Sequence, residues 1–277
     1  MIITRISGGL GNQMFQYAMA KAMAKKNGDN FKLDISFYPQ QALRKYELNL
    51  FNIEENIATE GDSKELRGRE GLLFKIKNKF GIHTKRPLTY IKEKIEWLSI
   101  FQKDTCDLKG DIYLDGFWQH ENYFKDIKSE ISKEFTLKQQ ISNEAKEYLS
   151  DIQKSQSISL HVRRGDYVQN IHTNRIHGTC DLEYYNKSIE HINNKINSPI
   201  FFIFSDDMSW CQENFNFLDN KVFVDDTQTA FDDLELMQNC KHNIIANSTF
   251  SWWGAWLNKN ENKIVVSPKF WASSNLN

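Results

Sequence analysis

The second half of the chain alternates short apolar runs with amphipathic stretches, and this alternation constrains the fold more than any other feature. From residue 157 onward, nearly continuous apolar runs of strand length are separated by segments of helical periodicity. Strands of this kind are buried on both faces, as in a parallel sheet with helices on either side. The expected strands are 157–162, 200–204, 221–224, 242–246 and 263–267, and the expected helices are 182–196, one after residue 207, 230–240 and 249–257.

The N-terminal part shows the same pattern on a smaller scale. A β-branched run over 2–6 leads through a glycine-rich turn into a helix over 14–26, and a strand follows over 31–35. Such a β-loop-α-β unit is typical of a parallel sheet. A strand over 111–118 and helices over 121–134 and 142–149 are also expected, whereas residues 52–110 are charged and weakly periodic.

We place the domain boundary in the polar stretch over 138–156, which gives domains 1–150 and 151–277. The expected architecture is two doubly wound α/β halves that face each other across a cleft. In open parallel sheets, ligands bind beyond the carboxyl ends of the strands, so the functional residues are expected there.

Charge and cysteine usage exclude several classes of protein. The chain has 35 Lys and Arg against 36 Asp and Glu, so it lacks the basic surplus of a nucleic-acid or anionic-membrane binder. No apolar stretch reaches the roughly 18 to 20 residues of a membrane span, and the N-terminus lacks a signal-peptide layout. The four scattered cysteines predict neither a zinc site nor a disulfide framework. We expect a cytoplasmic protein that associates at most peripherally with the inner membrane.

The first chemical motif is the glycine-rich turn that begins at Gly8 (GGLGNQ). It is a weak match to a dinucleotide fingerprint, because the third glycine position is occupied by the bulky Met14. Two interpretations stay open, a structural tight turn and a turn whose backbone approaches a ligand with Asn12 and Gln13 at the start of a helix.

The second motif, HVRRGDY from His161 to Tyr167, follows an apolar strand. Side chains alternate along a strand, so Arg163 and Arg164 should diverge, one toward the ligand edge and one toward the helix layer. Arginine suits a diphosphate because its planar fork binds phosphate oxygens in pairs. The alternative is a surface ion pair with Asp166, worth only about 0–1 kcal/mol.

The third motif, NSTFSWWG, runs from Asn247 to Gly254 and opens a helix with hydroxyl side chains. The free N–H groups and the dipole of a helix start favour an anion, although an ordinary N-cap is the simpler interpretation. The acid pairs, such as Asp206-Asp207, are expected to cap helices. No Asp-x-Asp pair occurs that could hold a divalent cation beside a sugar nucleotide, so arginine and a helix end are expected to replace a metal.

Taken together, these blocks resemble the signature motifs of the alpha-1,2-fucosyltransferases. The matching segments are GGLGNQMFQYA from Gly8, DGFWQ from Asp115, HVRRGDY from His161, FSDD from Phe204 and IIANSTFSWWGAWL from Ile244, in the order of the family. The resemblance does not cover residues 52–110.

The resemblance implies a GT-B-type fold of two Rossmann-like domains, with an N-terminal domain on the acceptor side and a C-terminal domain that binds the GDP-sugar. It implies inverting transfer of L-fucose from GDP-β-L-fucose to the 2-hydroxyl of a terminal galactose, as in surface glycan or O-antigen synthesis, without a metal or other cofactor. The expected partners are GDP-fucose and a galactose-terminated oligosaccharide or glycolipid.

The resemblance also implies roles for particular residues. Arg163 would bind the β-phosphate of GDP, and Arg164 would be a structural partner within the domain. The other implied donor-binding residues are His161, Asp233, Ser248, Thr249 and Ser251; Asn12 would face the reacting centre, and Gln13, Trp118 and Gln119 would contact the acceptor.

The chemistry requires a base for the attacking hydroxyl, and Asp166 is the first candidate because it follows the arginines. His172, Asp181 and Glu183 stay open as alternatives. Other functions also stay open: transfer of another GDP-sugar or to another hydroxyl, a dehydrogenase, and a non-catalytic carbohydrate-binding protein.

Overall fold

The structure is a computed structural model of the 277-residue chain, and it describes residues 1–41, 44–68, 87–94, 100–169, 174 and 178–271. The chain divides into two compact units, residues 1–138 and 139–277. The boundary predicted after residue 150 falls within helix α6 (Asn143–Lys154). The buried residues of this helix, Ala145 and Ile152, share a core with α11 (Ala230–Asn239), so α6 belongs to the second unit.

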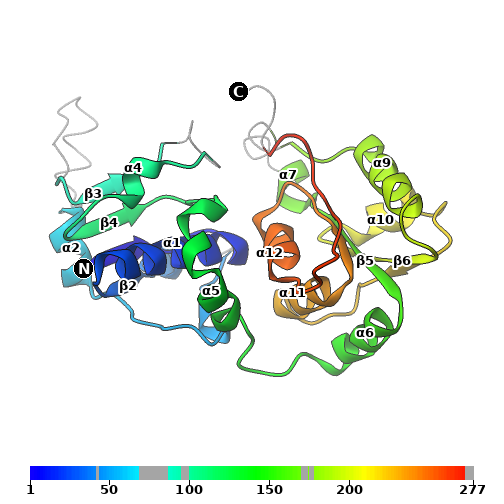
Figure 1. The fold of residues 1–277 in the computed structure, drawn as a ribbon, viewed down its shortest axis with the longest axis horizontal. Coiled ribbons are helices and arrows are strands. Elements are labelled where there is room, and N and C mark those ends of the chain that lie inside the picture. The colour runs from blue at the N-terminus through cyan, green and yellow to red at the C-terminus, as the bar shows by residue number, and fades with distance from the viewer. Residues whose placement is uncertain (42–43, 69–86, 95–99, 170–173, 175–177, 272–277) are drawn as a thin grey trace. The chain divides into compact units, whose positions relative to one another are not determined.

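The first unit is built on a four-stranded parallel sheet with the strand order β2-β1-β4-β3 (Figure 1). The strands are β1 (Ile2–Arg5), β2 (Phe31–Asp34), β3 (Tyr90–Lys92) and β4 (Ile112–Asp115); the α-helices are α1 (Leu10–Asn27), α2 (Glu60–Arg67), α4 (Lys103–Cys106) and α5 (Lys128–Glu134); and the 3-10 turns are η1 (Tyr38–Gln40), η2 (Leu48–Leu50), η4 (Glu121–Tyr123) and η5 (Lys125–Ile127). The predicted strands over 2–6, 31–35 and 111–118 are confirmed, the last of them in shorter form.

Helix α1 begins earlier than the sequence pattern predicts. It starts at Leu10, inside the glycine-rich turn, with Gly9 as its N-cap. It ends at Gly28, whose φ of 64° is the left-handed conformation that glycine adopts at low cost. The last four residues of the glycine-rich segment, Leu10 to Gln13, therefore form the first turn of the helix, and Gly8 and Gly9 lead into it.

The helix predicted over 121–134 is confirmed only in its second half. The chain forms the short turns η4 and η5 in the first half, followed by the seven-residue α5. Tyr123 and Phe124, in the turns before α5, are both buried, at 6% and 0% exposed. Phe124 packs edge-on against Phe15 of α1.

The second unit contains a five-stranded parallel sheet with the order β7-β6-β5-β8-β9. Its strands are β5 (Gln156–Val162), β6 (Pro199–Ser205), β7 (Lys221–Phe223), β8 (His242–Ile244) and β9 (Val265–Val266), and its helices are α6, α7 (Gly165–Gln169), α9 (Leu182–Asn193), α10 (Met208–Asn214), α11 and α12 (Thr249–Leu257). The alternation predicted from residue 157 onward is confirmed.

Helices cover both faces of the second sheet, as the continuous apolar strands predict. Along β6, Phe201 and Ile203 pack with residues of α9 and α10. Phe202 and Phe204, which point the other way, pack with residues of α6 and α11. Figure 1 shows α9 and α10 on one side of the β5–β6 pair and α6 and α11 on the other.

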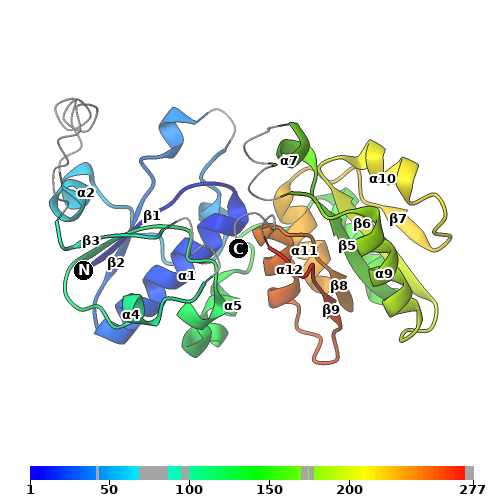
Figure 2. The same ribbon diagram turned by 90° about the horizontal axis from the view of Figure 1, so that it is seen from above.

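The order of the strands fixes where a ligand site can form in each unit. In the second unit the chain leaves β5 toward β6 on one side and later returns to β8 on the other, so the strand order reverses between β5 and β8. In the first unit the corresponding reversal lies between β1 and β4. Ligands of open parallel sheets bind at the carboxyl ends of the strands at such a reversal. Figure 2 gives a second view of both sheets.

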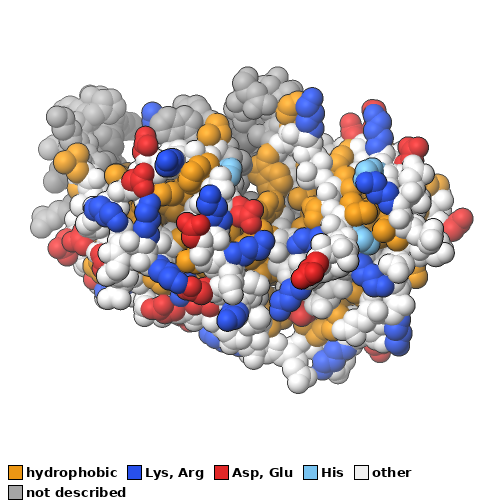
Figure 3. All heavy atoms as spheres, in the orientation of Figure 1, with side chains coloured by type: hydrophobic (Ala, Val, Ile, Leu, Met, Phe, Trp, Pro, Cys, Tyr) orange, Lys and Arg blue, Asp and Glu red, His pale blue; other side chains and the backbone are white. Residues whose placement is uncertain are grey.

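Among the described residues, no helix has both the length and the apolar composition of a membrane span. Lys, Arg, Asp and Glu side chains are interspersed over the visible face in Figure 3. This distribution matches the near-balance of charge in the sequence.

Candidate active site

Arg163 lies at the carboxyl end of β5, beside the strand reversal of the second sheet, where the sequence predicts a phosphate-binding group. Its Nη1 is 2.9 Å from Oδ2 of Asp206, and its guanidinium lies 5.4 Å from the ring centre of Tyr167. The Tyr167 hydroxyl donates to the carbonyl of Asn247 in the turn before α12 (3.3 Å). These contacts hold the guanidinium in place while 21% of the Arg163 side chain stays exposed.

Asp206 binds the two arginines through different oxygens. Its Oδ2 pairs with Arg163, and its Oδ1 accepts the backbone N–H of Arg164 at 2.8 Å. The approach is close because residue 165 is glycine: a Cβ there would lie 2.5 Å from Oδ2 of Asp206. One carboxylate thus fixes both the side chain of Arg163 and the turn that follows it.

The expectation that both residues of the Asp206-Asp207 pair cap a helix is half right. Asp207 is the N-cap of α10, accepting from the backbone N–H of Trp210 at 3.3 Å. Asp206 has the different role described above. The parallel register, which pairs Val162 with Ser205, places the residues after these strands side by side.

Arg164 diverges from Arg163, as strand alternation predicts. Its Nε lies 3.0 Å from Oδ2 of Asp207, and its guanidinium carbon lies 4.3 Å from the ring centre of Trp210. Both partners belong to the start of α10. Arg164 therefore anchors the end of β5 to α10.

His161, the residue of β5 two positions before Arg163, is buried at 5% exposure. Burial and the nearby charge of Arg163 lower the pKa of its imidazole to about 4, so the ring is neutral at physiological pH. The ring lies 5.9 Å from that of Phe250 on α12. Its buried Nδ1 has no hydrogen-bond partner in the described structure, and such an atom is a candidate for contact with a bound polar ligand.

The start of α12 lies at the same edge, directly after β8 and its short turn. Ser248 is the N-cap residue, but its side chain does not cap the helix. Ser251 is 1% exposed, and its hydroxyl donates to the carbonyl of Ser248 at 3.2 Å. The structure thus gives Ser251 a bond within its own helix, whereas Ser248 and Thr249 stand at the helix start, where an anion is favoured.

Asp233 lies in the first turn of α11, six residues after Thr227, whose hydroxyl donates to its Oδ1 at 2.7 Å. Burial raises the pKa of the Asp233 carboxyl to about 6. The neighbouring Asp232 has a structural role, since it accepts the backbone N–H of Ser142 at 3.0 Å. Asp233 is thus the member of this pair suited to a ligand.

In the first unit, two of the predicted residues are brought together at the strand reversal. The side-chain amide of Gln119, which follows β4, donates to Oδ1 of Asn12 on α1 at 3.0 Å. Gly8 permits this arrangement: its φ is 80°, and a Cβ there would lie 2.7 Å from Nδ2 of Asn12.

The other two predicted acceptor-binding residues have structural contacts. Gln13 is fully buried; its amide donates to the carbonyl of Lys45 (2.8 Å) and its carbonyl accepts the N–H of Glu47 (2.9 Å). Trp118 is also fully buried, with its ring edge-on to Tyr123. Neither side chain is exposed to an incoming sugar in this structure.

The candidates for the catalytic base differ in what the structure describes. The side chain of Asp166 and all of His172 lie outside the described residues. Asp181 is the N-cap of α9, accepting from the N–H of Tyr184 at 2.8 Å. Glu183 pairs with Lys187 on the exposed face of the same helix. The contacts of Asp181 and Glu183 are those of helix-stabilising residues.

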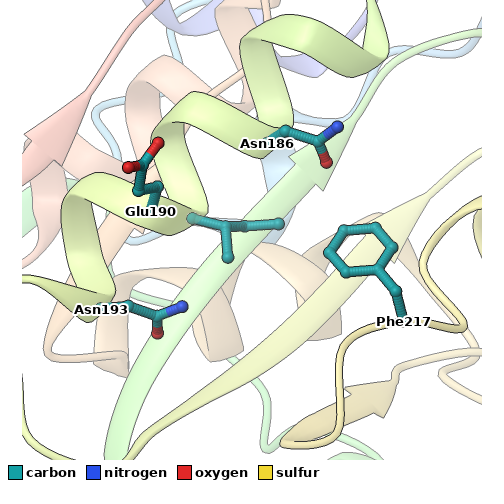
Figure 4. A pocket seen from close by; sticks show the side chains of 5 residues that line it. Asn186, Glu190, Asn193 and Phe217 are labelled. Carbon is teal, nitrogen blue, oxygen red and sulfur yellow. The ribbon is translucent and has the colours of Figure 1, made fainter.

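Two further features lie apart from these residues. The described residues contain no group of three or more His, Cys, Asp or Glu side chains placed to hold a metal ion. A pocket of about 330 Å³ lies beside α9 (Figure 4) and is lined by Asn186, Ile189, Glu190, Asn193 and Phe217. None of these five residues is a predicted site residue.

Comparison with known proteins points to one family of glycosyltransferases. The chain matches glycosyl transferase family 11 over residues 1–277. An alpha-1,2-colitosyltransferase of Escherichia coli is 36% identical over 277 residues, covering 98% of this chain and 92% of that protein. The O-antigen biosynthesis glycosyltransferase WbnK of Escherichia coli is 34% identical over 290 residues, covering 98% of this chain and 94% of that protein.

Two groups of solved structures are similar in fold. The alpha-1,6-fucosyltransferase NodZ, soaked with GDP-fucose, matches with a TM-score of 0.53 and 13% identity, over 92% of this chain and 91% of NodZ. POFUT1 in complex with GDP-fucose matches with a TM-score of 0.52 and 12% identity, over 97% of both chains. At these identities the likeness concerns the fold alone, and it agrees with the predicted α/β class.

The close approach of Gly165 to Asp206 predicts a sharp effect of a single methyl group. In Gly165→Ala the new Cβ displaces the Asp206 carboxylate, so the ion pair between Asp206 and Arg163 is broken. We expect the affinity for GDP, measured by titration calorimetry, to fall about 10- to 100-fold, the scale of one charged hydrogen bond. Gly61→Ala in α2, where the nearest atom is 3.6 Å from the added Cβ, is the matched control. Unchanged affinity in Gly165→Ala would contradict the role of Asp206.

Proposed function

This chain belongs to glycosyl transferase family 11, and we propose that it transfers L-fucose from GDP-β-L-fucose to the 2-hydroxyl of a terminal galactose, with inversion at the anomeric carbon. One observation carries the proposal: the guanidinium of Arg163 is held by Asp206 at the strand reversal of the second sheet, beside the start of α12. This is a preorganised cation at the place where parallel sheets bind nucleotides.

The second unit binds the donor in this proposal. Arg163 contacts the β-phosphate of GDP, and the start of α12, with Ser248 and Thr249, provides further N–H and hydroxyl donors. The neutral ring of His161 lies beneath the nucleoside with its unpaired Nδ1 available for a hydrogen bond. Asp233 accepts hydrogen bonds from the guanine base, whose N1–H and 2-amino group are donors.

The chemistry follows from where charge develops. As the bond between the anomeric carbon and GDP breaks, negative charge builds on the β-phosphate, and a fixed guanidinium stabilises that transition state. The galactose hydroxyl attacks from the opposite face and inverts the centre, as water does in inverting glycoside hydrolysis. A base must take the hydroxyl proton, and Asp166, at the start of α7, is our candidate. Arginine and the helix end do the work that a divalent cation does elsewhere, so no metal is required.

The first unit supplies the acceptor side. Asn12 and Gln119 are bonded to each other at the reversal between β1 and β4, and both belong to the segments that resemble the fucosyltransferase motifs. Amide side chains can donate to and accept from sugar hydroxyls at once, which suits recognition of a galactose. Gln13 and Trp118 shape this side from within the core.

A second donor is supported by a specific observation, the 36% identity to a colitosyltransferase. Colitose is fucose without its 3-hydroxyl, so the two donors differ by one polar group on the same GDP. A site that hydrogen-bonds the 3-hydroxyl would favour fucose strongly, whereas an apolar site would discriminate weakly.

The two donors are distinguished by assaying each of them separately. Purified protein is incubated with lactose, EDTA and either GDP-fucose or GDP-colitose, and the product linkage is determined by NMR. We expect fucosyl transfer to the 2-hydroxyl of galactose with the higher kcat/KM. Transfer of colitose alone would overturn the donor assignment. Activity that is restored only by Mg²⁺ or Mn²⁺ would overturn the metal-free mechanism. Binding of the glycan without transfer would indicate a carbohydrate-binding protein.

Substitution of Arg163 tests the phosphate contact. Arg163→Lys keeps the charge but loses the planar fork, so we expect the fold to persist and kcat to fall roughly 10²- to 10³-fold, the scale for one oriented transition-state donor. The matched control is Arg164→Lys, one residue along, which should lower the melting temperature more than it lowers kcat. Equal losses of kcat in the two variants would contradict the assignment.

The raised pKa of Asp233 predicts a pH dependence of donor binding. Its carboxyl titrates at about pH 6 in the free protein, and only the ionised form accepts both guanine donors. Lowering the pH from 7.5 to 5 should therefore raise the Kd for GDP about tenfold beyond any effect of the phosphate itself. Asp233→Asn should lose this extra dependence, because the phosphate titrates equally in both proteins. His161, with a pKa of about 4, stays neutral over this range. Identical pH profiles for the two proteins would refute the role of Asp233.

A further inference from the structure

A buried carboxylate stands at the end of the edge strand β3, beside the turn that follows β4 and outside the sequence motifs described above. Glu93 directly follows β3, and its backbone N–H donates to the carbonyl of Asp115 at the end of β4 (3.0 Å). It is 6% exposed. A glutamate side chain is almost never buried to this degree unless it is paired with partners in the structure.

The Glu93 carboxylate holds the turn that follows β4. Its Oε2 accepts the backbone N–H of Phe117 at 2.6 Å and that of Trp118 at 3.2 Å. The turn lies so close that a Cβ on Gly116 would be 2.4 Å from the Cβ of Glu93. The other oxygen, Oε1, is buried with no partner among the described residues. The contacts of this carboxylate are thus directed to one turn.

The turn needs such support because of its backbone conformation. Trp118 has φ of 55°, a left-handed conformation that a bulky side chain rarely adopts. Conformations of this kind persist where the surroundings fix them, and they are common at functional sites. The Trp118 ring is locked in the core against Tyr123, so the backbone at this position is fixed from both sides.

The next residue along is Gln119, whose amide reaches Asn12. A second buried side chain ties the two loops together: Gln16 accepts the N–H of Ser7 (2.9 Å) and donates to the carbonyl of Gly116 (3.0 Å). The Asn12–Gln119 contact is therefore set by the position of the turn that Glu93 holds.

We propose that Glu93 is a positioning residue for the acceptor: through the backbone of Phe117 and Trp118, its carboxylate aims Gln119 at Asn12 and so sets the hydrogen bonds offered to the galactose. The inference rests on the proposed function in one respect, that Asn12 and Gln119 face the acceptor. Glu93 itself touches no substrate.

Two substitutions of Glu93 distinguish the effect of its hydrogen-bonding oxygen from the effect of its charge. Glu93→Gln keeps an oxygen that can accept both N–H groups, and we expect its acceptor kcat/KM to stay within about threefold of wild type. Glu93→Met fills the same space without that oxygen, and we expect acceptor kcat/KM to fall about tenfold, the scale of a lost buried hydrogen bond, while the KM for GDP-fucose stays within about twofold. In a Gln119→Ala background the Met substitution should have little further effect, because the two act through one contact.

Hydrogen exchange tests the positioning without relying on activity. The amides of Phe117 and Trp118 should lose protection in Glu93→Met and keep it in Glu93→Gln. Asp34→Asn is the matched control, since Asp34 is an equally buried carboxylate in the same sheet that accepts from Tyr113 rather than from this turn. It should lower stability without a selective loss of acceptor kcat/KM. If Glu93→Met does not fold, Glu93→Asp, which withdraws the oxygen by one methylene, should show the same selective losses.

The possible outcomes separate this inference from the proposed function. The positioning role would be overturned if Glu93→Met weakened the kinetic constants for the donor and for the acceptor equally. It would also be overturned if the effects of Glu93→Met and Gln119→Ala on acceptor kcat/KM were fully additive. Lost protection at the two amides in a protein whose wild type transfers no fucose would overturn the proposed function and leave the structural link intact. Unchanged protection in Glu93→Met would refute the link itself.

Discussion

The carboxylate of Asp206 is the contact on which the second unit's site depends. A guanidinium is useful to a departing diphosphate only if it is already in place, because any reorganisation during the reaction adds to the barrier. The Asp206 carboxylate binds the side chain of Arg163 and the backbone N–H of Arg164. Gly165 leaves room for both bonds. Arg164, clamped between Asp207 and Trp210, fixes the same turn from the helix side.

The two units use the same physical arrangement beside their strand reversals. In each, a carboxylate that follows a neighbouring strand accepts backbone N–H groups from the turn under its control: Asp206 from Arg164, and Glu93 from Phe117 and Trp118. In each, a glycine in that turn allows the close approach. Turns at the ends of parallel strands carry the functional side chains but have few backbone partners of their own, so a carboxylate from the neighbouring strand is an efficient way to fix them, whether buried as Glu93 is or exposed as Asp206 is.

The sequence predicts well what depends on local periodicity. The apolar strands, the helices on both faces of the second sheet, and the divergence of Arg163 and Arg164 all follow from alternation along one segment. It predicts poorly what depends on which strands become neighbours. The sequence predicts a helix cap for Asp206 because its actual partner, Arg163, is 43 residues away along the chain. Only the pairing of β5 with β6 brings the two residues together.

Glu93 was missed for a similar reason. It follows the three-residue β3, which lies within a weakly periodic segment and pairs with β4, a strand that comes later in the chain. Gln13 and Trp118 belong to motifs that suggest contact with a ligand, but both side chains point inward in this structure. Their role toward the acceptor stays a prediction. The functional assignments of Asn12, Gln119 and the donor-binding residues remain proposals that their geometry supports.

The central claim is that Arg163, held ready by Asp206, meets the charge of a departing nucleoside diphosphate. A crystal structure of the protein with GDP, grown without divalent cations, tests it most directly. The account predicts the Arg163 guanidinium within hydrogen-bond distance of the β-phosphate, with the phosphates at the start of α12. A diphosphate bound elsewhere, with Arg163 turned away from it, would contradict the account.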